Sequence, residues 1–286
     1  MRGKSQTRGG SLTDSTLDHA ESFPAVSEQC TSEPIPSRPF RPEGAMTATA
    51  PATAVPPLED DVLTAVDGGR LRLVPRIGTS TVLFLHGAGS GVDTPLFEAL
   101  AAGLAAAGVR VGRLEMPYRV AGRRAPDRPA RLDAVAVAAA EALAVAGPLA
   151  LAGVSMGSRV AMRVATTVGA RGVLALGFPL RPPGTTAAGQ PRPSRQGELD
   201  GAAVPVLVVQ GDRDPFGCPR PDPARDRRVH LVAGGDHSFR TRVRDGRPAG
   251  DAVAEAARVG AAFLLGVLAS PGAGAGGRES AAAETS

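Results

Sequence analysis

Residues 149–159, Leu-Ala-Leu-Ala-Gly-Val-Ser-Met-Gly-Ser-Arg, form the stretch that decides the interpretation of this chain. An aliphatic run ends at Gly153, and the pattern Gly-x-Ser-x-Gly places Ser155 between two glycines. A helix-compatible segment, residues 158–165, follows at once. This order predicts a strand, a tight turn that strains the backbone of Ser155, and a helix. The flanking glycines leave room for the close approach of strand and helix.

The pattern by itself is weak evidence, because 36 of the 286 residues are glycine and a plain Gly-Ser turn would produce it as well. The surrounding sequence supports the strand–turn–helix interpretation, since short aliphatic runs alternate with alanine-rich helical runs. Such repeated units predict an α/β fold, in which a mainly parallel sheet has helices on both faces. The expected strands are 71–74, 81–85, 109–114, 149–153, 172–176, 204–209 and 228–232, and the expected helices are 95–107, 129–146, 158–165 and 251–268.

Composition divides the chain into three parts. Residues 1–58 are rich in Ser, Thr, Pro and Glu, and we expect them to be disordered because they bury too little apolar surface to offset chain entropy. They contain no apolar signal region, and Met46 is an alternative start of translation. Residues 59–269 are expected to form one α/β domain. Residues 270–286 are expected to be a flexible tail.

The composition also argues against several classes of function. The net charge is +4, with one Tyr and no Trp, and basic and aromatic residues are not interleaved, so we expect no nucleic-acid binding. No apolar stretch approaches the ~18 residues needed to cross a bilayer. Two cysteines without metal-ligand spacing predict neither a disulfide framework nor a metal, and no cofactor is expected. We therefore expect a cytoplasmic protein without membrane contact, while its oligomeric state is left open.

Ligands of parallel sheets bind at the carboxyl ends of the strands, so the residues that follow each strand are the candidate site. The loop His86-Gly-Ala-Gly-Ser-Gly91 follows the strand 81–85. Its glycines allow the backbone to approach a ligand closely and to turn its N–H groups inward. We expect His86 to brace this loop and not to act as a base. A dinucleotide-binding pattern would need glycine at position 92, where the chain has Val92.

Three residue types that together activate a serine follow three different strands. Ser155 comes first in the chain, an aspartate next, and His237 last. A histidine in this arrangement takes the proton of the serine hydroxyl, and the acid holds the imidazole in the required tautomer. We favour Asp214 as the acid because it lies far enough beyond its strand to reach a neighbouring loop. Asp212 is the alternative, although it is expected to pin the turn, and Asp236 is expected to bond its own loop.

The chain resembles the α/β-hydrolase superfamily and is close to dienelactone hydrolases in compactness. More closely, it resembles a small α/β-hydrolase-like family that includes many bacterial proteins. The same family contains the hydrolase-like domain of a subunit of the non-specific-lethal histone acetyltransferase complex and a testis-expressed homologue. The matching segments are Leu85–Gly89, Pro117–Arg119, Gly122–Arg124, Gly153–Arg159, Phe178–Leu180, Pro182–Gly184, Gln210–Gly217 and Gly235–Phe239.

The resemblance implies a serine hydrolase that cleaves a small ester, thioester, lactone or amide through an acyl-enzyme. It matches the family's acid to Asp214, beside Ser155 and His237. It also implies that the backbone N–H groups of Ala88 and Met156 form the oxyanion hole. Because the family includes members used as scaffolds, a catalytically silent domain that binds a partner protein is the alternative. A nucleotide- or phosphate-binding domain that uses residues 87–91 is a third reading.

The surroundings of the expected site predict an open pocket for a small substrate. The expected strands 172–176 and 204–209 are separated by too few residues for a large helical lid. Arginines close to strand ends suggest that this substrate is anionic, although a solvated Arg/Pro loop would look the same. The expected substrate rim consists of Tyr118, Arg119, Arg123, Arg124 and Arg181.

Overall fold

The computed structural model describes residues 62–73, 78–143 and 147–270. The expected disordered segment 1–58, with its alternative start at Met46, lies outside the described residues. Residues 271–286 of the expected tail also lie outside them. Every residue that the sequence analysis assigns to the site lies inside the described ranges.

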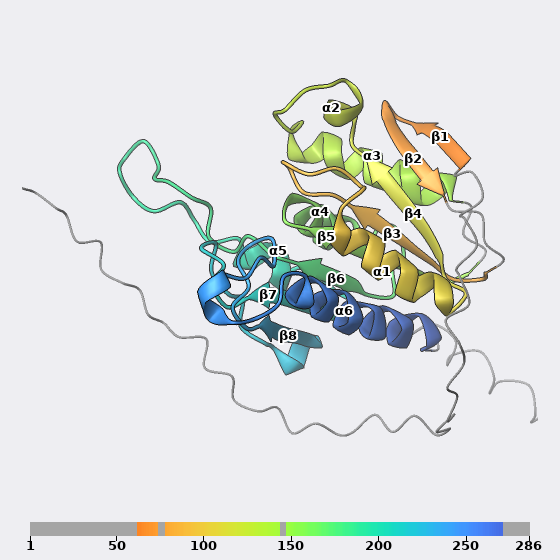
Figure 1. Ribbon diagram of the computed structural model, residues 1–286. Coiled ribbons are helices and arrows are strands. Elements are labelled where there is room, and N and C mark those ends of the chain that lie inside the picture. Colours follow the sequence, from red (N-terminus) through yellow and green to blue (C-terminus); the bar gives the residue numbers. More distant parts are fainter. Residues whose placement is uncertain (1–61, 74–77, 144–146, 271–286) are drawn as a thin grey trace, which may run out of the picture. The chain divides into compact units, whose positions relative to one another are not determined.

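Eight strands of the described chain form one sheet in the order β1-β2-β4-β3-β5-β6-β7-β8 (Figure 1). The strands β4, β3, β5, β6, β7 and β8 run parallel to one another, whereas β1 and β2 are antiparallel to their neighbours. The expected mainly parallel sheet is therefore confirmed. The strands are β1 (Val62–Val66), β2 (Gly69–Leu73), β3 (Thr81–Leu85), β4 (Arg110–Glu115), β5 (Leu149–Val154), β6 (Val173–Leu176), β7 (Val206–Gly211) and β8 (Arg227–Val232).

The antiparallel edge of the sheet is a hairpin that the sequence analysis missed. It predicted a strand over 71–74 but no partner before it, whereas β1 and β2 pair through a two-residue turn. Asp67 and Gly68 occupy that turn with φ of 45° and 75°. Positive φ at both central residues is the requirement of a type I′ turn. The Asp-Gly dipeptide between aliphatic runs was the signal that predicts such a hairpin.

Helices cover both faces of the sheet, as expected. Helices α1 and α6 lie side by side on one face, and α3 and α4 pack together on the other (Figure 1). Helix α3 ends before the expected residue 146, and the short helices α2 and α5 were not predicted. The helices are α1 (Pro95–Ala106), α2 (Pro117–Val120), α3 (Pro129–Ala142), α4 (Met156–Val164), α5 (Gln196–Asp200) and α6 (Asp251–Ala269), with 3₁₀ turns at Pro223–Arg225 and Val243–Asp245.

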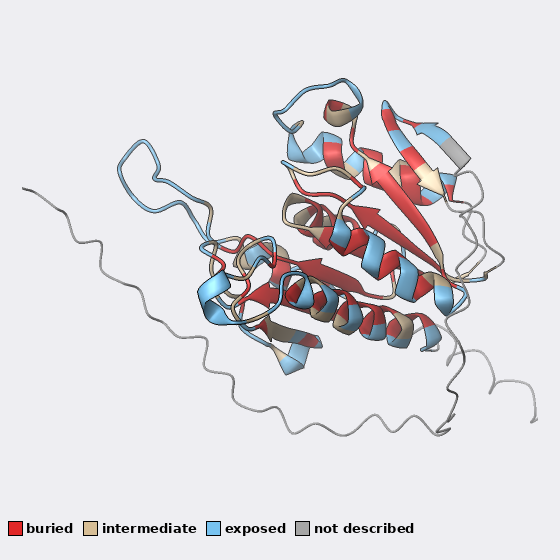
Figure 2. Cartoon of the chain, viewed as in Figure 1, coloured by how far each residue is buried: buried red, intermediate tan, exposed pale blue. Residues whose placement is uncertain are grey.

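The central strands are buried on both faces, which explains their continuous aliphatic sequences (Figure 2). In β3, Leu83 and Leu85 belong to the apolar layer under α3 and α4. Val82 and Phe84 belong to the layer under α1 and α6. Burying such a side chain contributes roughly 1.5–3 kcal/mol. The strand ends are therefore held rigidly, and so are the loops that start from them.

Helix α1 begins and ends where its local sequence dictates. The side chain of Thr94 accepts a hydrogen bond from the N–H of Phe97 (3.3 Å), and Pro95 occupies the first helical position. Thr94 is thus an N-cap, which satisfies one of the N–H groups that have no partner within the helix. Gly108 follows the helix with φ of 74°, a conformation that favours glycine.

Helix α6 corrects the expectation that no apolar stretch reaches the length of a membrane span. Among the described residues, α6 is the helix that is long and apolar enough to cross a bilayer. Half of its apolar window is buried against α1 and the sheet, and a core helix passes the same test. Gly260 faces the sheet so closely that a Cβ atom there would lie 2.6 Å from Leu174. Packing in the core thus accounts for its apolar composition.

Candidate active site

Ser155 stands at the sharp turn between β5 and α4. Its φ of 50° and ψ of −110° lie outside the regions that L-residues normally occupy, so the predicted strain is present. A Cβ atom at Gly157 would overlap the carbonyl of Leu85, and one at Gly153 would overlap the backbone of Gly157. Only glycine at both positions permits this contact between strand and helix, and the contact lifts Ser155 above the carboxyl edge of the sheet.

Ser155, His237 and Asp214 form an unbroken hydrogen-bonded chain. The Nε2 atom of His237 lies 2.9 Å from the Oγ of Ser155, and its Nδ1 lies 2.7 Å from Oδ2 of Asp214. A carboxylate only accepts hydrogen bonds, so Nδ1 carries the proton and Nε2 is left to accept from the serine hydroxyl. The Asp214 side chain has no exposed surface, whereas the imidazole is 23% exposed and open to a ligand. Residues distant in sequence thus meet in one hydrogen-bonded chain.

The carboxylate of Asp214 is oriented by two donors besides His237. Nε2 of Gln210, at the end of β7, donates to Oδ2 at 2.6 Å, and the N–H of Phe216 donates to Oδ1 at 2.9 Å. Oε1 of Gln210 accepts from the N–H of Phe178 at 2.9 Å. The Phe216 ring meets the His237 ring edge-on, with centroids 4.4 Å apart. Sequence reasoning assigned no role to Gln210, although a polar residue at the end of an aliphatic strand is the signal that marks it.

Of the three candidate aspartates, the described structure brings only Asp214 to His237. Asp212 is exposed at the start of the same loop. The Oδ1 atom of Asp236 accepts from two backbone N–H groups of its own loop, at 2.8 and 2.9 Å. This side chain therefore stabilises the loop that carries His237.

His86 braces the loop after β3. Its Nε2 lies 3.0 Å from the N–H of Met116, which can only donate, so Nε2 is unprotonated. The proton is on Nδ1, which donates to the carbonyl of Gly87 at 2.8 Å. Burial lowers the pKa of His86, and the nearby guanidinium of Arg119 also lowers it. His86 is thus a neutral brace whose two ring nitrogens are both occupied.

The two expected oxyanion donors have free N–H groups. Within the described ranges, neither Ala88 nor Met156 donates a backbone hydrogen bond. Met156 is the first residue of α4, where N–H groups have no partner within the helix. The loop runs against the elbow, since a Cβ atom at Gly87 would lie 3.5 Å from the Cβ of Ser155. Both residues are half-buried, and Met156 directly follows Ser155 in the chain.

Tyr118 does not lie on a substrate rim, which corrects the sequence expectation. Its side chain is completely buried under the loop after β3. The hydroxyl donates to the carbonyl of Ala88 at 3.0 Å and lies 3.4 Å from that of Gly87. Pro117 starts α2 directly after β4, and this short helix turns the aromatic ring inward. The sequence did not reveal this direction because it predicted no helix there.

Arg119, one residue further along α2, is half-buried beside the same loop. Its Nη2 lies 4.0 Å from the position of a Cβ atom on Gly91. Its Nε is buried and has no hydrogen-bond partner among the described residues. Nor does any described carboxylate pair with this guanidinium. A cation that is partly desolvated and unpaired beside the candidate site favours an anionic ligand.

The other three arginines of the expected rim are exposed. Arg123 pairs with Asp127 at 2.6 Å. Arg124 is exposed. Arg181 is exposed and lies against Gly217 of the loop that follows Asp214, while its N–H donates to the carbonyl of Phe216. The structure therefore distinguishes Arg119 from the rest, since it alone combines burial with a free nitrogen among these four described arginines.

The segment between β6 and β7, residues 177–205, is described in full and contains no helical lid. A bridge between Thr185 and Pro191 closes a hairpin whose residues 183–194 are all exposed. Figure 1 shows this teal hairpin extending away from the sheet, and the short helix α5 follows it. The expected absence of a large lid thus holds for this segment, and the site is open.

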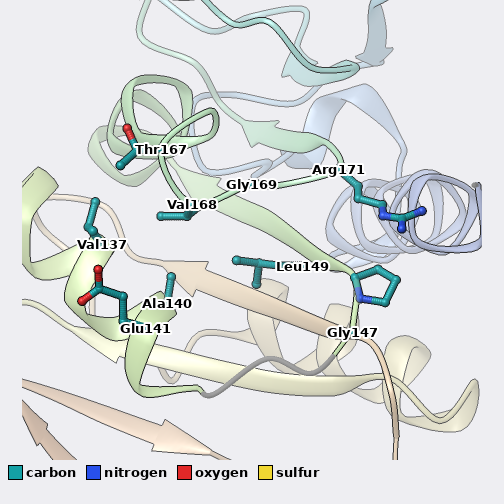
Figure 3. Close-up of a pocket in the computed structure, with 10 residues that line it drawn as sticks. Val137, Ala140, Glu141, Gly147, Leu149, Thr167, Val168, Gly169 and Arg171 are labelled. Carbon is teal, nitrogen blue, oxygen red and sulfur yellow. The ribbon is translucent and has the colours of Figure 1, made fainter. Parts of the chain in front are cut away.

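A hollow of about 740 Å³ lies beside Leu149, the first residue of β5 (Figure 3). Val137 and Ala140 of α3 line it together with Leu149 and Val168. Because β5 begins at Leu149, roughly 17 Å of strand separates this hollow from the serine. It is therefore not part of the triad's site. Within the described ranges, no group of three His, Cys, Asp or Glu side chains gathers as metal ligands would.

The family profile described as alpha/beta hydrolase domain matches residues 78–265. The match covers the strands β3 to β8 and every residue of the candidate site. The chain therefore belongs to the α/β-hydrolase family, and it is a hydrolase by class. No curated protein sequence matches it significantly.

Several solved structures share this fold. A dienelactone hydrolase from Anabaena variabilis has a TM-score of 0.55 and 19% identity, covering 73% of this chain and 97% of its own. An alpha-beta serine hydrolase homologue from Coxiella burnetii has a TM-score of 0.53 and 16% identity, covering 72% and 97%. Est1E from Butyrivibrio proteoclasticus has a TM-score of 0.53 and 14% identity, covering 74% and 100%. At these identities the likeness establishes the fold.

Proposed function

We propose that this protein is a serine hydrolase that cleaves a small ester, thioester, lactone or amide through an acyl-enzyme. The observation that carries the proposal is the hydrogen-bonded chain from Ser155 through His237 to Asp214. Three further features support it: the strained backbone of the serine, the buried acid with two donors besides His237, and the free N–H groups of Ala88 and Met156.

In the proposed reaction, the Oγ of Ser155 attacks the substrate carbonyl while Nε2 of His237 takes its proton. Asp214 stabilises the imidazolium through Nδ1–H. The N–H groups of Ala88 and Met156 donate to the oxyanion of the tetrahedral intermediate. The imidazolium then protonates the leaving group, whose bond to the carbonyl carbon breaks to give the acyl-enzyme. Water repeats these steps, and Ser155 is released with a free acid.

Covalent labelling tests the proposal directly. We expect a fluorophosphonate probe to form one adduct per chain on Ser155, located by intact mass and peptide mapping. The adduct should be absent in Ser155→Ala and strongly slowed in His237→Ala, because the base is needed to activate the hydroxyl. A folded wild-type protein that remains unlabelled would contradict the proposal and favour the scaffold alternative, in which the same variants still bind a partner protein.

We further propose that the substrate carries an anionic group that pairs with Arg119. The unpaired, half-buried guanidinium beside Gly91 supports this choice. Arg119→Ala is expected to lower kcat/KM for esters that carry a free carboxylate by about 10- to 100-fold. This range corresponds to the ~1.5–3 kcal/mol of a hydrogen bond to a charged group. Steady-state kinetics on matched neutral and carboxylated esters measures the effect.

The matched control for this experiment is Arg124→Ala, because Arg124 is exposed. It should change kcat/KM by less than about twofold for both esters, since exposed charges are screened by solvent. Neutral esters should be unaffected by either substitution. Equal kcat/KM values of wild type and Arg119→Ala on the carboxylated ester would contradict the anionic substrate.

Two further points are the extent of the catalytic domain and the place in the cell where the protein acts. We propose that residues 59–269 form the catalytic domain, flanked by segments that take no part in the reaction. We propose further that it acts in the cytoplasm on a small-molecule substrate, without nucleic acid, membrane, metal or cofactor. The modest net charge of +4 and the packed position of α6 support this.

A further inference from the structure

Two successive carbonyl groups of the loop after β3 converge on the hydroxyl of Tyr118. The Oη atom lies 3.0 Å from the carbonyl oxygen of Ala88 and 3.4 Å from that of Gly87. The Gly87 carbonyl also accepts from Nδ1 of His86 at 2.8 Å. Both side chains are completely buried beneath the loop. The Gly87 carbonyl also accepts from the N–H of Ser90 at 3.3 Å, so the loop is held by the side chains of His86 and Tyr118 and by its own turn.

The direction of these carbonyls determines the direction of two N–H groups. In a trans peptide the C=O and N–H bonds point in opposite directions. The peptide that contains the Gly87 carbonyl also contains the N–H of Ala88, and the next one contains the N–H of Gly89. With both carbonyls turned toward Tyr118, both N–H groups point away from it. Successive N–H groups on one side of the backbone form a concave site for an anion.

The same loop lies against the elbow that carries the serine. A Cβ atom at Gly87 would lie 3.5 Å from the Cβ of Ser155, so the loop backbone touches the elbow. We propose that Tyr118 is a positioning residue which, together with His86, aims the N–H groups of Ala88 and Gly89 at the oxyanion that forms at Ser155. This inference rests on the serine hydrolase function proposed above.

The loop needs such an external partner because of its own sequence. Residues 87–91, Gly-Ala-Gly-Ser-Gly, contain three glycines and have little intrinsic stiffness. His86 holds only the Gly87 carbonyl, and Tyr118 is the partner of the Ala88 carbonyl in the described structure. Burial raises the pKa of Tyr118 to about 12, so its hydroxyl remains a donor at all physiological pH values. Since the ring has no exposed surface, it acts through the loop and not on the substrate.

Tyr118→Phe removes the hydroxyl and keeps the ring, so it tests this role. We expect kcat on an activated ester to fall about 10- to 100-fold with KM changed by less than about threefold, because an oxyanion donor acts mainly in the transition state. The affinity for a trifluoromethyl ketone, which forms a tetrahedral adduct with a serine, should fall by the same factor as kcat/KM. Affinity for the product carboxylic acid should remain unchanged.

The control is Thr94→Ala, which removes the N-cap of α1 at the other end of the same connection. It should lower the melting temperature because α1 loses its cap. The affinity for the trifluoromethyl ketone, relative to that for the product acid, should stay unchanged because the loop carbonyls remain in place. If Tyr118 had only a structural role, Tyr118→Phe would likewise lower the melting temperature and leave the affinity for the ketone relative to the product acid unchanged. A Tyr118→Phe variant that is folded, with kcat and ketone affinity within twofold of wild type, would overturn the inference.

Two measurements on the wild-type protein test the inference without relying on a variant. The amide proton of Ala88 should shift downfield in NMR spectra when the trifluoromethyl ketone adduct forms, and an unchanged shift would overturn the inference. Tyr118 is the only tyrosine of the chain, and there is no tryptophan. Its absorbance titration therefore reports on this side chain alone, and a tyrosinate that forms near pH 10 in the folded protein would overturn the buried contact.

The labelling experiment separates this inference from the function on which it rests. If fluorophosphonate does not label Ser155 in the wild type, the serine hydrolase function fails and the positioning role fails with it. If Ser155 is labelled normally while Tyr118→Phe retains full kcat and ketone affinity, only the positioning role is overturned.

Discussion

Replacing Ser155 or His237 with alanine is expected to lower kcat by about 10⁴- to 10⁶-fold, and the double variant should be no slower than either single variant. The two residues act as one unit, because the hydroxyl is a weak nucleophile without the base and the base has nothing to deprotonate without the hydroxyl. Their 2.9 Å contact is the structural basis of this coupling. Steady-state kinetics on an activated ester measures all three variants.

The rate that remains in these variants measures the catalysis that does not depend on Ser155 and His237. The N–H groups of Ala88 and Met156 remain intact in these variants, so a rate of about 10³- to 10⁴-fold above the uncatalysed reaction should persist. Circular dichroism and the melting temperature serve as controls that each variant is folded. Strictly additive losses in the double variant would show that Ser155 and His237 act independently, which contradicts the proposed triad.

Asp214→Asn is expected to lower kcat by about 10³- to 10⁴-fold with little change in KM. The carboxylate accepts from Nδ1 of His237 and Nε2 of Gln210 at Oδ2, and from the N–H of Phe216 at Oδ1. An asparagine has one oxygen, so its NH₂ group must face a donor in either orientation. When the NH₂ group faces His237, the imidazole adopts the tautomer with the proton on Nε2 and no longer accepts the serine proton.

Asp212→Asn is the matched control, because it makes the same chemical change two residues away on an exposed side chain. We expect its kcat to remain within about twofold of wild type, as surface substitutions away from special features have small effects. Comparison of the two variants on the same ester measures which aspartate orients the base. A large loss in Asp212→Asn with a normal Asp214→Asn would reverse the assignment of the acid.

The parts of the site that could be predicted are those determined by local backbone chemistry. A serine with positive φ between a strand and a helix requires glycines two residues before and after it, and this constraint is visible in Gly153 and Gly157. The aliphatic strands were visible because a sheet covered on both faces buries every position. The hairpin at Asp67 and Gly68 is equally local, because an Asp-Gly dipeptide between two aliphatic runs predicts it.

The direction of the Tyr118 side chain could not be predicted from the sequence. From its position after β4, the side chain was expected on a substrate rim. The turn of α2 instead buries the ring beneath the loop after β3, where its hydroxyl meets carbonyls 30 residues away along the chain. No local pattern predicts this contact, because it depends on how two loops from neighbouring strands pack together.

The sequence by itself determined the fold class, the elbow around Ser155 and the chain order of serine, acid and base, because periodicity and glycine placement act over a few residues. Only the tertiary structure decided that Asp214 and not Asp212 reaches His237, that Gln210 orients this acid, and that Arg119 is left unpaired. The contact between Asp214 and His237 joins the ends of the separate parallel strands β7 and β8. It arises only when the packed sheet brings those ends to one edge.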